Sequence, residues 1–537
     1  MEIHRSRCPN NGCRTVQLSL DGVTQSKSSC VSLDIYSTSF TACRTIYPLT
    51  IVRPINRFPI GYREYLDKIL GDLQTANCQV TKFIGDNPKR AIVREALNHA
   101  SHYACEYCIS KAGRAQIVEK PEKEMTSITE TIKFIENLSG SSKMTNTKDR
   151  HLQCLEGIKK KLNSNKARSH LAWPYSTSKG KGRTDEMTEN IVQEIENGET
   201  DHDMVKGIIG RSLFLDIEHF SFTNDIPAEY MHSVCLGLVR RVIELTFSVG
   251  ETRSRVSTRR LSPPTKFNKL MTTVQVPREF SRRLRNLDLS VIKAQEYRNI
   301  ITCLFPIVIE CIESQAKERR LWLMLAYMIR SCIVPNLEYS CINQNDLKEV
   351  CDKFYALYEQ LFGIRNCSYS VHLVSTHLPQ IRGAQPLTET SAFKYENFYS
   401  EVRKSFAAGT KATLKQIFQR TLLKRSLSFH SCALPIYFSN KSTKMEANNL
   451  VYIHKNNRYK MYKIHTVHDN TLLCYEQGFF KYAMKETPEI NWETVGVFKE
   501  GGISEETVTL NELQIHGKVI RVCSLLITVP INILRES

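Results

Sequence analysis

Four side chains with a metal-binding pattern lie in two distant parts of the 537-residue chain. Cys105 and Cys108 form a CxxC pair, and two thiols at this spacing can bind one tetrahedral zinc ion. A structural zinc site needs four ligands, and no second CxxC pair follows closely. The HxxxxH pair of His372 and His377 is the natural second half-site. An alternative pair of histidines is closer to the cysteines in sequence: His99 and His102.

The 18 cysteines of the chain are scattered and form no dense disulfide framework. The basic segment Met1–Arg14 has no apolar core, so we do not expect a secretory signal. A 61.7 kDa chain of this kind is expected in a reducing compartment, where most of its thiols are free and buried. A close pair of cysteines is then a metal-ligand candidate before it is a disulfide.

Three acidic side chains follow or accompany elements that could hold them rigidly. Asp21 lies near the end of a predicted strand, and Asp86 directly follows another. Glu396 lies in a predicted helix, on one face with Phe393, Asn397 and Ser400. Each acid also has an ordinary interpretation: Asp21-Gly is typical of a turn, Asp86-Asn-Pro of a helix cap, and Glu396 of an exposed helix position.

The order of these motifs predicts that they converge. The CxxC pair begins 19 residues after Asp86, and the HxxxxH pair ends 19 residues before Glu396. A zinc ion that joined the two pairs would bring Glu396 towards Asp21 and Asp86. Three converging carboxylates can hold two divalent cations about 3.5–4 Å apart, as in enzymes that displace a group at phosphorus. Mg²⁺ suits such a site, with Mn²⁺ as the alternative, because it prefers oxygen ligands and keeps exchangeable waters.

The chain is basic, with 73 Lys and Arg against 55 Asp and Glu and a net charge of +18. A basic chain favours a polyanionic partner, most simply nucleic acid, although a basic surface alone is equally compatible with another role. Basic residues interleaved with apolar ones follow Glu396, which predicts an amphipathic helix that faces either solvent or a DNA backbone. They are Arg403, Lys404, Lys411, Lys415, Arg420, Lys424 and Arg425.

The elements expected to position the acids begin near residue 15. Alternating or β-branched sequence predicts strands at Thr15–Val23, Ser32–Phe40 and Thr45–Val52. Helical spacing of Tyr65, Ile69, Leu70 and Leu73 predicts a helix over 60–76. A strand at Gln79–Ile84 and a helix from Arg90 follow. This order suits an α/β fold, a mixed sheet with helices on its faces.

The rest of the chain divides by composition. Polar stretches at 139–148 and 174–186 predict linkers, and 251–260 predicts a basic loop. Residues 186–363 and 386–430 are mainly helical in pattern, with strong apolar stretches at Val234–Phe247 and Leu321–Val334. From residue 448 short strands, such as Leu450–His454 and Lys518–Val529, predict a small β-rich C-terminal domain. No stretch is apolar enough for a membrane span.

The motifs together resemble those of DDE transposases with an RNase H-like core. They are most similar to animal members of the CACTA superfamily, which are related to Transib transposases and the V(D)J recombinase. The resemblance spans residues 15–425 and rests on six segments. They are Leu18–Ser29 (LSLDGVTQSKSS), Phe40–Pro54 (FTACRTIYPLTIVRP), Asp86–Arg90 (DNPKR), Tyr103–Cys108 (YACEYC), Pro227–Gly237 (PAEYMHSVCLG) and Phe393–Phe398 (FKYENF).

The resemblance implies a role for each candidate residue. Asp21, Asp86 and Glu396 match the catalytic acids, which bind two Mg²⁺ or Mn²⁺ ions, and the CxxC and HxxxxH pairs match the ligands of one structural Zn²⁺. The implied organisation is a short basic segment (1–14), a first core part (15–108), a mainly helical insertion (109–371), the end of the core (372–430) and the C-terminal domain (448–537).

The implied function is DNA strand cleavage followed by transfer of the 3′-hydroxyl end, in the nucleus, by a homodimer or higher multimer. Two other functions remain open. One is a transposase-derived nuclear protein that binds DNA or chromatin without chemistry, and the other is a zinc-stapled scaffold that binds only protein.

An acid-x-x-His segment, Glu229 to His232, adds a further alternative. It could contribute to the metal site, but we favour a role in capping a helix of the insertion. Asp216 and Asp225 are rival acids to Asp86 in the same stretch.

Overall fold

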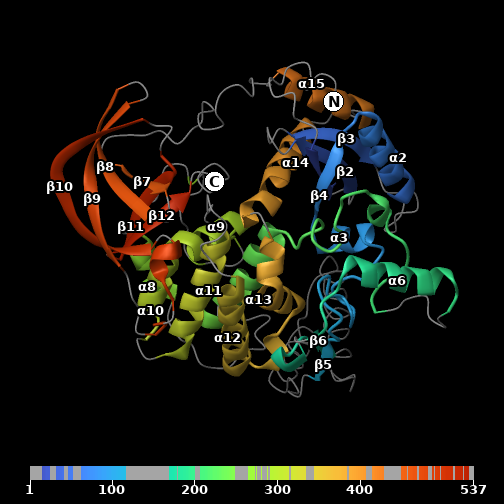
Figure 1. Cartoon of the computed structure of the whole chain (residues 1–537), viewed down its shortest axis with the longest axis horizontal. Coiled ribbons are helices and arrows are strands. Elements are labelled where there is room, and N and C mark those ends of the chain that lie inside the picture. Colours follow the sequence, from blue (N-terminus) through green and yellow to red (C-terminus); the bar gives the residue numbers. More distant parts are fainter. Residues whose placement is uncertain are drawn as a thin grey trace, which may run out of the picture.

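The computed structural model contains a mixed sheet, a group of packed helices and a β-barrel (Figure 1). The expected α/β class is therefore confirmed as a mixed α/β structure. The structure describes residues 15–24, 32–40, 46–52, 62–116, 169–177, 180–199, 206–247, 264–272, 274, 280, 287, 291–313, 316–333, 344–383, 386–406, 414–427, 449–455, 458–468, 471–481, 486–488, 490–495, 497–511, 515–523 and 525–530. The predicted segment 1–14, the linker 139–148 and the basic loop 251–260 lie outside these residues.

The mixed sheet is formed by the four strands predicted at the start of the chain. They are β1 (Thr15–Thr24), β2 (Ser32–Phe40), β3 (Ile46–Val52) and β4 (Gln79–Ile84). The order across the sheet is β3-β2-β1-β4. The pairs β2–β3 and β1–β2 are antiparallel, whereas β4 runs parallel to β1. The carboxyl ends of β1 and β4 therefore lie at the same edge.

Strand β1 is covered on both faces, which its alternating sequence explains. Val16, Leu18 and Leu20 are buried in an apolar cluster with helix α2 (Tyr62–Thr75). The alternate residues Gln17 and Ser19 point to the opposite face and are also buried. A polar face is buried here because another element supplies hydrogen-bond partners for it.

The buried face of α2 differs from the prediction at one position. The predicted set began with Tyr65, but Tyr65 is 44% exposed. Leu66, Ile69 and Leu73 instead face the sheet, at i, i+3 and i+7. The tyrosine stands one residue from this face, so it reaches solvent while its neighbour enters the core.

Helix α14 (Phe393–Phe406) covers the polar face of the sheet. The hydroxyl of Tyr399 lies 2.9 Å from Ser19 Oγ and 3.1 Å from Ser37 Oγ, and that of Tyr395 lies 3.0 Å from Ser39 Oγ. These contacts join strands of the first hundred residues to a helix near residue 400. Helix α15 (Leu414–Leu427) follows and packs against α14 and β3.

The central part of the chain is mainly helical. A short helix, α3 (Asn87–Val93), follows β4, and a two-stranded sheet pairs β5 (Gly113–Gln116) with β6 (Ser169–Ala172). The remaining helices are α6 (Asp185–Glu196), α7 (Arg240–Phe247), α8 (Pro264–Met271), α9 (Ala294–Asn299), α10 (Phe305–Cys311), α11 (Lys317–Ile333), α12 (Gln344–Phe362) and α13 (Tyr369–Arg382).

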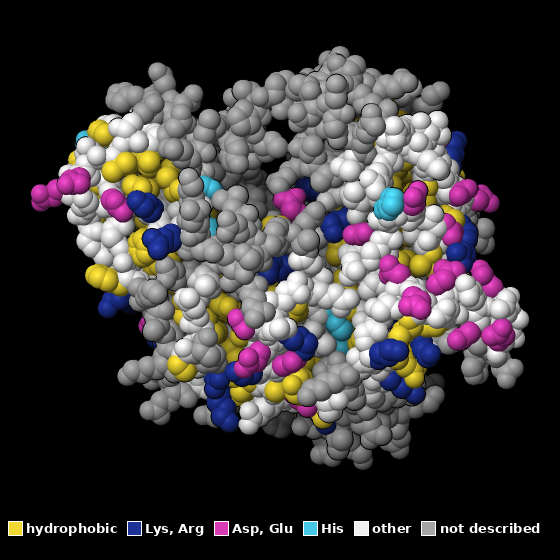
Figure 2. Space-filling view, viewed as in Figure 1, with side chains coloured by type: hydrophobic (Ala, Val, Ile, Leu, Met, Phe, Trp, Pro, Cys, Tyr) yellow, Lys and Arg dark blue, Asp and Glu magenta, His cyan; other side chains and the backbone are white. Residues whose placement is uncertain are grey.

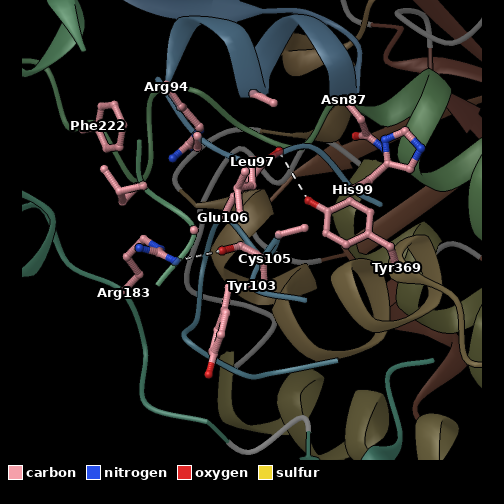
Figure 3. A pocket seen from close by; sticks show the side chains of 15 residues that line it. Asn87, Arg94, Leu97, His99, Tyr103, Cys105, Glu106, Arg183, Phe222 and Tyr369 are labelled. Atoms are coloured by element: carbon pink, nitrogen blue, oxygen red, sulfur yellow. Dashed lines mark hydrogen bonds between the residues drawn. The ribbon is translucent and has the colours of Figure 1, made fainter. Parts of the chain in front are cut away.

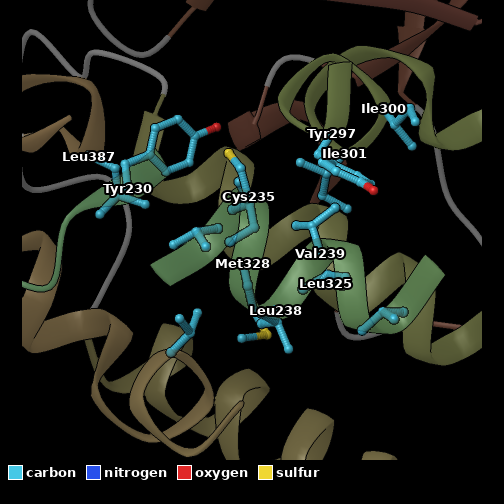
Figure 4. Close-up of a cluster of buried hydrophobic side chains, with 14 of the residues drawn as sticks. Tyr230, Cys235, Leu238, Val239, Tyr297, Ile300, Ile301, Leu325, Met328 and Leu387 are labelled. Atoms are coloured by element: carbon cyan, nitrogen blue, oxygen red, sulfur yellow. The ribbon is translucent and has the colours of Figure 1, made fainter. Parts of the chain in front are cut away.

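The apolar stretches predicted from the sequence form the centre of this helical part. A π-helical segment, η3 (Tyr230–Val239), continues directly into α7. Its side chains Cys235 and Leu238 face Leu325 and Met328 of α11 in one buried cluster (Figure 4). The predicted linker at 174–186 was wrong in part, because Arg183 is buried and Gly182 pairs with Cys108 in an isolated β-bridge.

The C-terminal strands close into a six-stranded barrel in the order β10-β12-β11-β7-β8-β9. Lys518–Val529, predicted as one strand, is a hairpin that turns at Cys523. The six strands are β7 (Leu450–Lys455), β8 (Arg458–His468), β9 (Thr471–Lys481), β10 (Val497–Asn511), β11 (Gly517–Val522) and β12 (Leu525–Pro530).

The barrel is joined to the helices by the buried side chain of Arg330 on α11. Its Nε donates to the carbonyl of Val495 at 2.8 Å, just before β10, and its Nη2 to the carbonyl of Thr528 in β12 at 3.1 Å. Nη1 donates to the carbonyl of Thr302 among the helices. A single guanidinium group thus bridges both parts of the molecule.

Candidate metal centre and acidic residues

The two predicted half-sites meet in one buried group, the Cys2His2 cluster of Cys105, Cys108, His372 and His377. The ligand atoms of all four side chains lie within 4.8 Å of one another. Cys105 Sγ is 3.5 Å from His377 Nε2, and Cys108 Sγ is 3.5 Å from His372 Nε2. The group could hold a metal ion such as zinc, because two sulfur and two imidazole ligands suit its tetrahedral preference.

The rival histidines do not take part in this cluster. His99 is exposed, and His102 Nδ1 lies 2.7 Å from the carbonyl oxygen of Ala112. All cysteines that the structure describes are free thiols, as expected.

Helix α13 and a loop after α3 position the four ligands. His372 and His377 are five residues apart on α13, and their rings are 5.2 Å apart. Trp173 stacks on His372 at 4.6 Å, and Tyr107 stacks on His377 at 5.3 Å. The rings fix both imidazoles and exclude water, which preorganises the site.

Two of the ligands, Cys108 and His372, have the charge state that a metal requires. The hydrogen bond from Cys105 is the main cause that holds the pKa of Cys108 far below its usual value. Burial raises the pKa of Cys105 and lowers that of His372. One thiolate and neutral imidazole are therefore present before any ion binds, and an ion would displace the remaining thiol proton.

A buried ion pair connects this cluster to helix α3. Arg90 Nε lies 3.0 and 3.1 Å from the two carboxylate oxygens of Glu106, one of the two residues between the cysteines. Arg90 also donates to the carbonyl of Gly85 at 2.8 Å. The sequence analysis missed this pair, although an acid inside the CxxC loop was a visible signal. It ties the end of β4 to the Cys2His2 cluster.

The acid trio, Asp21, Asp86 and Glu396, belongs to elements that meet at one edge of the sheet. Ser19 of β1 pairs with Ile84 of β4 in the parallel register. Asp21 and Asp86 each follow one member of this pair by two residues, so they lie at similar heights along the sheet. Asp21 is within β1 and pairs with Ile35, so the turn interpretation is wrong. Strand alternation puts Asp21 on the same face as Ser19, which is the face that α14 covers.

Asp86 also caps helix α3. Its Oδ1 accepts a hydrogen bond from the backbone N–H of Lys89 at 2.9 Å. The capping interpretation is therefore confirmed for one oxygen, and the carboxylate remains partly exposed.

Glu396 lies in the first turn of α14 and is partly buried. Phe393 of the same helix is anchored as expected, since it packs against Tyr230 and lies beneath the guanidinium of Arg298 at 4.7 Å. Asn397, which was predicted on this face, is exposed.

His232 lies within the electrostatic field of two members of the trio. Burial lowers the pKa of His232. The negative charges of Glu229, Glu396 and Asp86 have the larger opposite effect, so the pKa rises to about 9. Burial also raises the pKa of Tyr399 on α14, and the charge of Asp21 raises it further. Positive and hydroxyl-bearing side chains thus stand among the three acids.

Glu229 has the capping role that the sequence favoured. It is fully buried, it is the N-cap of η3, and its Oε2 accepts from the N–H of Met231 at 2.8 Å. The same oxygen accepts from the N–H of Ala392, at 3.1 Å, just before α14. Its Oε1 lies 2.6 Å from His232 Nδ1. Glu229 therefore holds both His232 and the start of the helix that carries Glu396.

The rival acids have other partners. Asp216 pairs with Arg211 at 2.8 Å, and Asp225 lies 3.5 Å from Lys82 Nζ. The backbone carbonyl of Asp225 accepts from Phe83 N–H at 2.8 Å, alongside β4.

The acid trio is not a closed metal site of the kind seen at the cysteines. Within the described part of the chain, the Cys2His2 cluster is the one group of three or more His, Cys, Asp or Glu side chains gathered closely enough for an ion. The structure thus brings Asp21 and Asp86 to one edge of the sheet, with Glu396 on the helix that covers β1, but it does not draw the three carboxylates into a single ligand shell.

The described basic side chains do not gather into one patch on the face shown in Figure 2. Lys and Arg occur there in separate groups, and Asp and Glu are frequent over α2 and α6. Among the basic residues after Glu396, Arg403 and Arg420 are exposed, and the side chains of Lys404, Lys411, Lys415, Lys424 and Arg425 lie outside the described set.

Comparison with known proteins gives no family assignment. No family model matches the chain, and no curated protein is similar to it. Within the described residues, no helix has the length and apolarity that crossing a membrane would need.

Proposed function

We propose that the chain is the core of a DDE-type DNA transposase with an RNase H-like fold. The observation that carries the proposal is that Asp21 and Asp86 lie at one edge of a β3-β2-β1-β4 sheet whose β1–β4 pair alone is parallel, with Glu396 on the helix that packs over β1. A mixed sheet with helices on its faces is compatible with the RNase H-like interpretation. Ligand sites in such sheets lie beyond the carboxyl ends of strands. Asp86 lies just beyond the end of β4, and Asp21 lies in the last part of β1.

The Cys2His2 cluster supports the long insertion that the proposal requires. It joins the loop at 105–108 to helix α13, and the contacting cysteine and histidine pairs are 264 and 272 positions apart. A zinc ion there would have a structural role, because four protein ligands leave no open position for substrate. The proposed core is thus residues 15–108 and 372–430, with the helices between them as an insertion.

In the proposed reaction, the acid trio would hold two Mg²⁺ or Mn²⁺ ions. When bound, the ions would supply activation of the attacking oxygen and stabilisation of the leaving oxygen. Tyr399 and the β1–β2 hydroxyls hold α14, and hence Glu396, against the sheet. His232, positively charged below about pH 9, would favour a phosphate group beside Glu396 and Asp86.

A second candidate is a transposase-derived nuclear protein that binds DNA or chromatin without cleavage. It is favoured by the open arrangement of the acid trio, which does not form a compact ligand group. The net charge of +18 is compatible with either candidate. For both we propose DNA as partner, a nuclear location and a dimer or higher multimer.

Nicking of supercoiled plasmid DNA tests the proposal. We expect nicking that needs Mg²⁺ or Mn²⁺ and that is lost in Asp21→Asn, Asp86→Asn and Glu396→Gln. Asp216→Asn is the matched control, since that acid pairs with Arg211 away from the trio. Salt-sensitive DNA binding without nicking would support the second candidate instead, and absence of DNA binding would leave the protein-binding scaffold.

A further inference from the structure

A pocket beside the Cys2His2 cluster is lined by two buried arginines that form no ion pair with an Asp or Glu of the described part of the chain. Arg94 at the end of α3 is 2% exposed, and Arg183 in the loop before α6 is 5% exposed. Both side chains reach the pocket from separate elements (Figure 3). The pocket opens to solvent, and the centres of water-sized groups can occupy about 20 Å³ of it, which is room for one small ligand.

Each arginine is held in place by backbone carbonyls and keeps a donor unused. Arg94 Nη2 donates to the carbonyl of Ile226 at 2.7 Å, and Arg183 Nη2 to the carbonyls of Lys206 at 2.9 Å and Cys105 at 3.4 Å. Arg94 Nε and Arg183 Nη1 are buried without any hydrogen-bond partner among the described residues. A buried donor without a partner is costly and calls for a ligand or water.

The local charges leave the two guanidinium groups uncompensated. The nearest acid in the pocket, Glu106, is already bound by Arg90 through both carboxylate oxygens. The thiolates of the Cys2His2 cluster would be neutralised by a divalent ion. Among the described residues, no Asp or Glu forms an ion pair with Arg94 or Arg183. Two positive charges buried together require a counter-charge.

The remaining lining shows which counter-charge fits. Phe222 lies under the guanidinium of Arg94 at 4.9 Å and keeps this planar group in one orientation. Asn87, His99 and Tyr103 add polar groups, and Ala91 and Leu97 supply apolar walls. Fixed guanidinium forks match the several acceptor oxygens of a tetrahedral oxyanion better than they match a halide.

We propose that this pocket, the Arg94–Arg183 site, binds a small free oxyanion of the inorganic phosphate class. The anion joins the end of α3, the Cys105–Cys108 loop and the loop before α6. Its binding stabilises the surroundings of the zinc ligands, because the pocket is lined by Cys105 and by Tyr369 of α13. The site does not depend on the activity proposed for the acid trio.

Calorimetry and thermal unfolding of the full zinc-loaded chain test the proposal, with inorganic phosphate titrated at ionic strength matched by NaCl. We expect saturable binding and a rise in Tm. Arg183→Lys keeps the charge but loses the fork, so its phosphate affinity falls about tenfold or more, as does that of Arg94→Gln. Arg330→Lys is the control. Arg330 is also a buried arginine that donates to backbone carbonyls, but it lies outside this pocket, so we expect the variant to leave phosphate affinity unchanged.

Two measurements keep the test decisive if a variant does not fold. In the unmodified chain, phosphate should slow hydrogen exchange in the segments around residues 94, 105 and 183. A duplex DNA that competes with phosphate for these segments would assign them to a DNA surface and overturn the proposal. Binding that never saturates, or equal affinity in the variants, would also overturn it and leave ordered water as the partner of the free donors.

Discussion

Loss of one zinc ligand should remove the ion and a large part of the stability. Closing the separation of 264 residues between Cys108 and His372 would cost an unfolded chain about 5–6 kcal/mol in loop entropy. The folded chain has already brought the ligands together, so zinc binds a preassembled site and cross-links it. We expect Cys108→Ser to lower the free energy of unfolding by about 4–6 kcal/mol, against about 5–15 kcal/mol for a typical domain.

Metal analysis and urea unfolding measure both effects on the same samples. The unmodified protein should contain one zinc ion per chain, and Cys108→Ser should contain none. Cys351→Ser is the matched control, because Cys351 is a fully buried thiol on α12 outside the cluster. It should keep its zinc and lose only about 1–2 kcal/mol. The reasoning fails if well-folded unmodified protein lacks zinc, or if both variants lose stability equally.

Two further predictions concern buried charges. Glu106→Gln leaves Arg90 charged and unpaired in the interior, so urea unfolding should show a loss of about 3–5 kcal/mol. Glu189→Gln removes a partly exposed partner of Arg211 and should cost less than about 1 kcal/mol; equal losses would contradict this. In Mg²⁺-free buffer, NMR should find the pKa of His232 near 9, above its ordinary 6.5. The pKa of His232 is higher in the folded chain than in the unfolded chain, so protonation of His232 stabilises the folded chain by on the order of 3 kcal/mol. This contribution is complete below pH 6.5 and is lost as pH rises through about 9. Mg²⁺ bound to the acid trio would lower that pKa, and an unchanged value at saturating Mg²⁺ would argue against the trio as its site.

The sheet and the metal cluster could be predicted because their signals are local or few. Ser32–Phe40 was predicted with its exact bounds, since alternation and β-branched residues mark strands within a short window. The Cys2His2 cluster follows from two spaced pairs, and only the choice between His372 with His377 and the nearer histidines needed further evidence.

Features that depend on tertiary contacts were not predictable in the same way. The stretch at 174–186 is polar in sequence, yet Arg183 is buried because carbonyl groups from distant loops surround it. Tyr65 and Leu66 are adjacent, and only the position of the sheet decides which of them is buried. The link from Glu229 to the start of α14 spans 163 residues, so no local pattern could indicate it.

The bridge made by Arg330 has a practical consequence for how the chain can be divided. Burial lowers the pKa of Arg330, yet carbonyls on both sides satisfy its donors. A shortened chain that ends before β12 would remove the Thr528 carbonyl and leave this buried cation with fewer acceptors. Fragments for crystallisation or activity assays should therefore keep the last strand, since it supplies an acceptor to this buried guanidinium group.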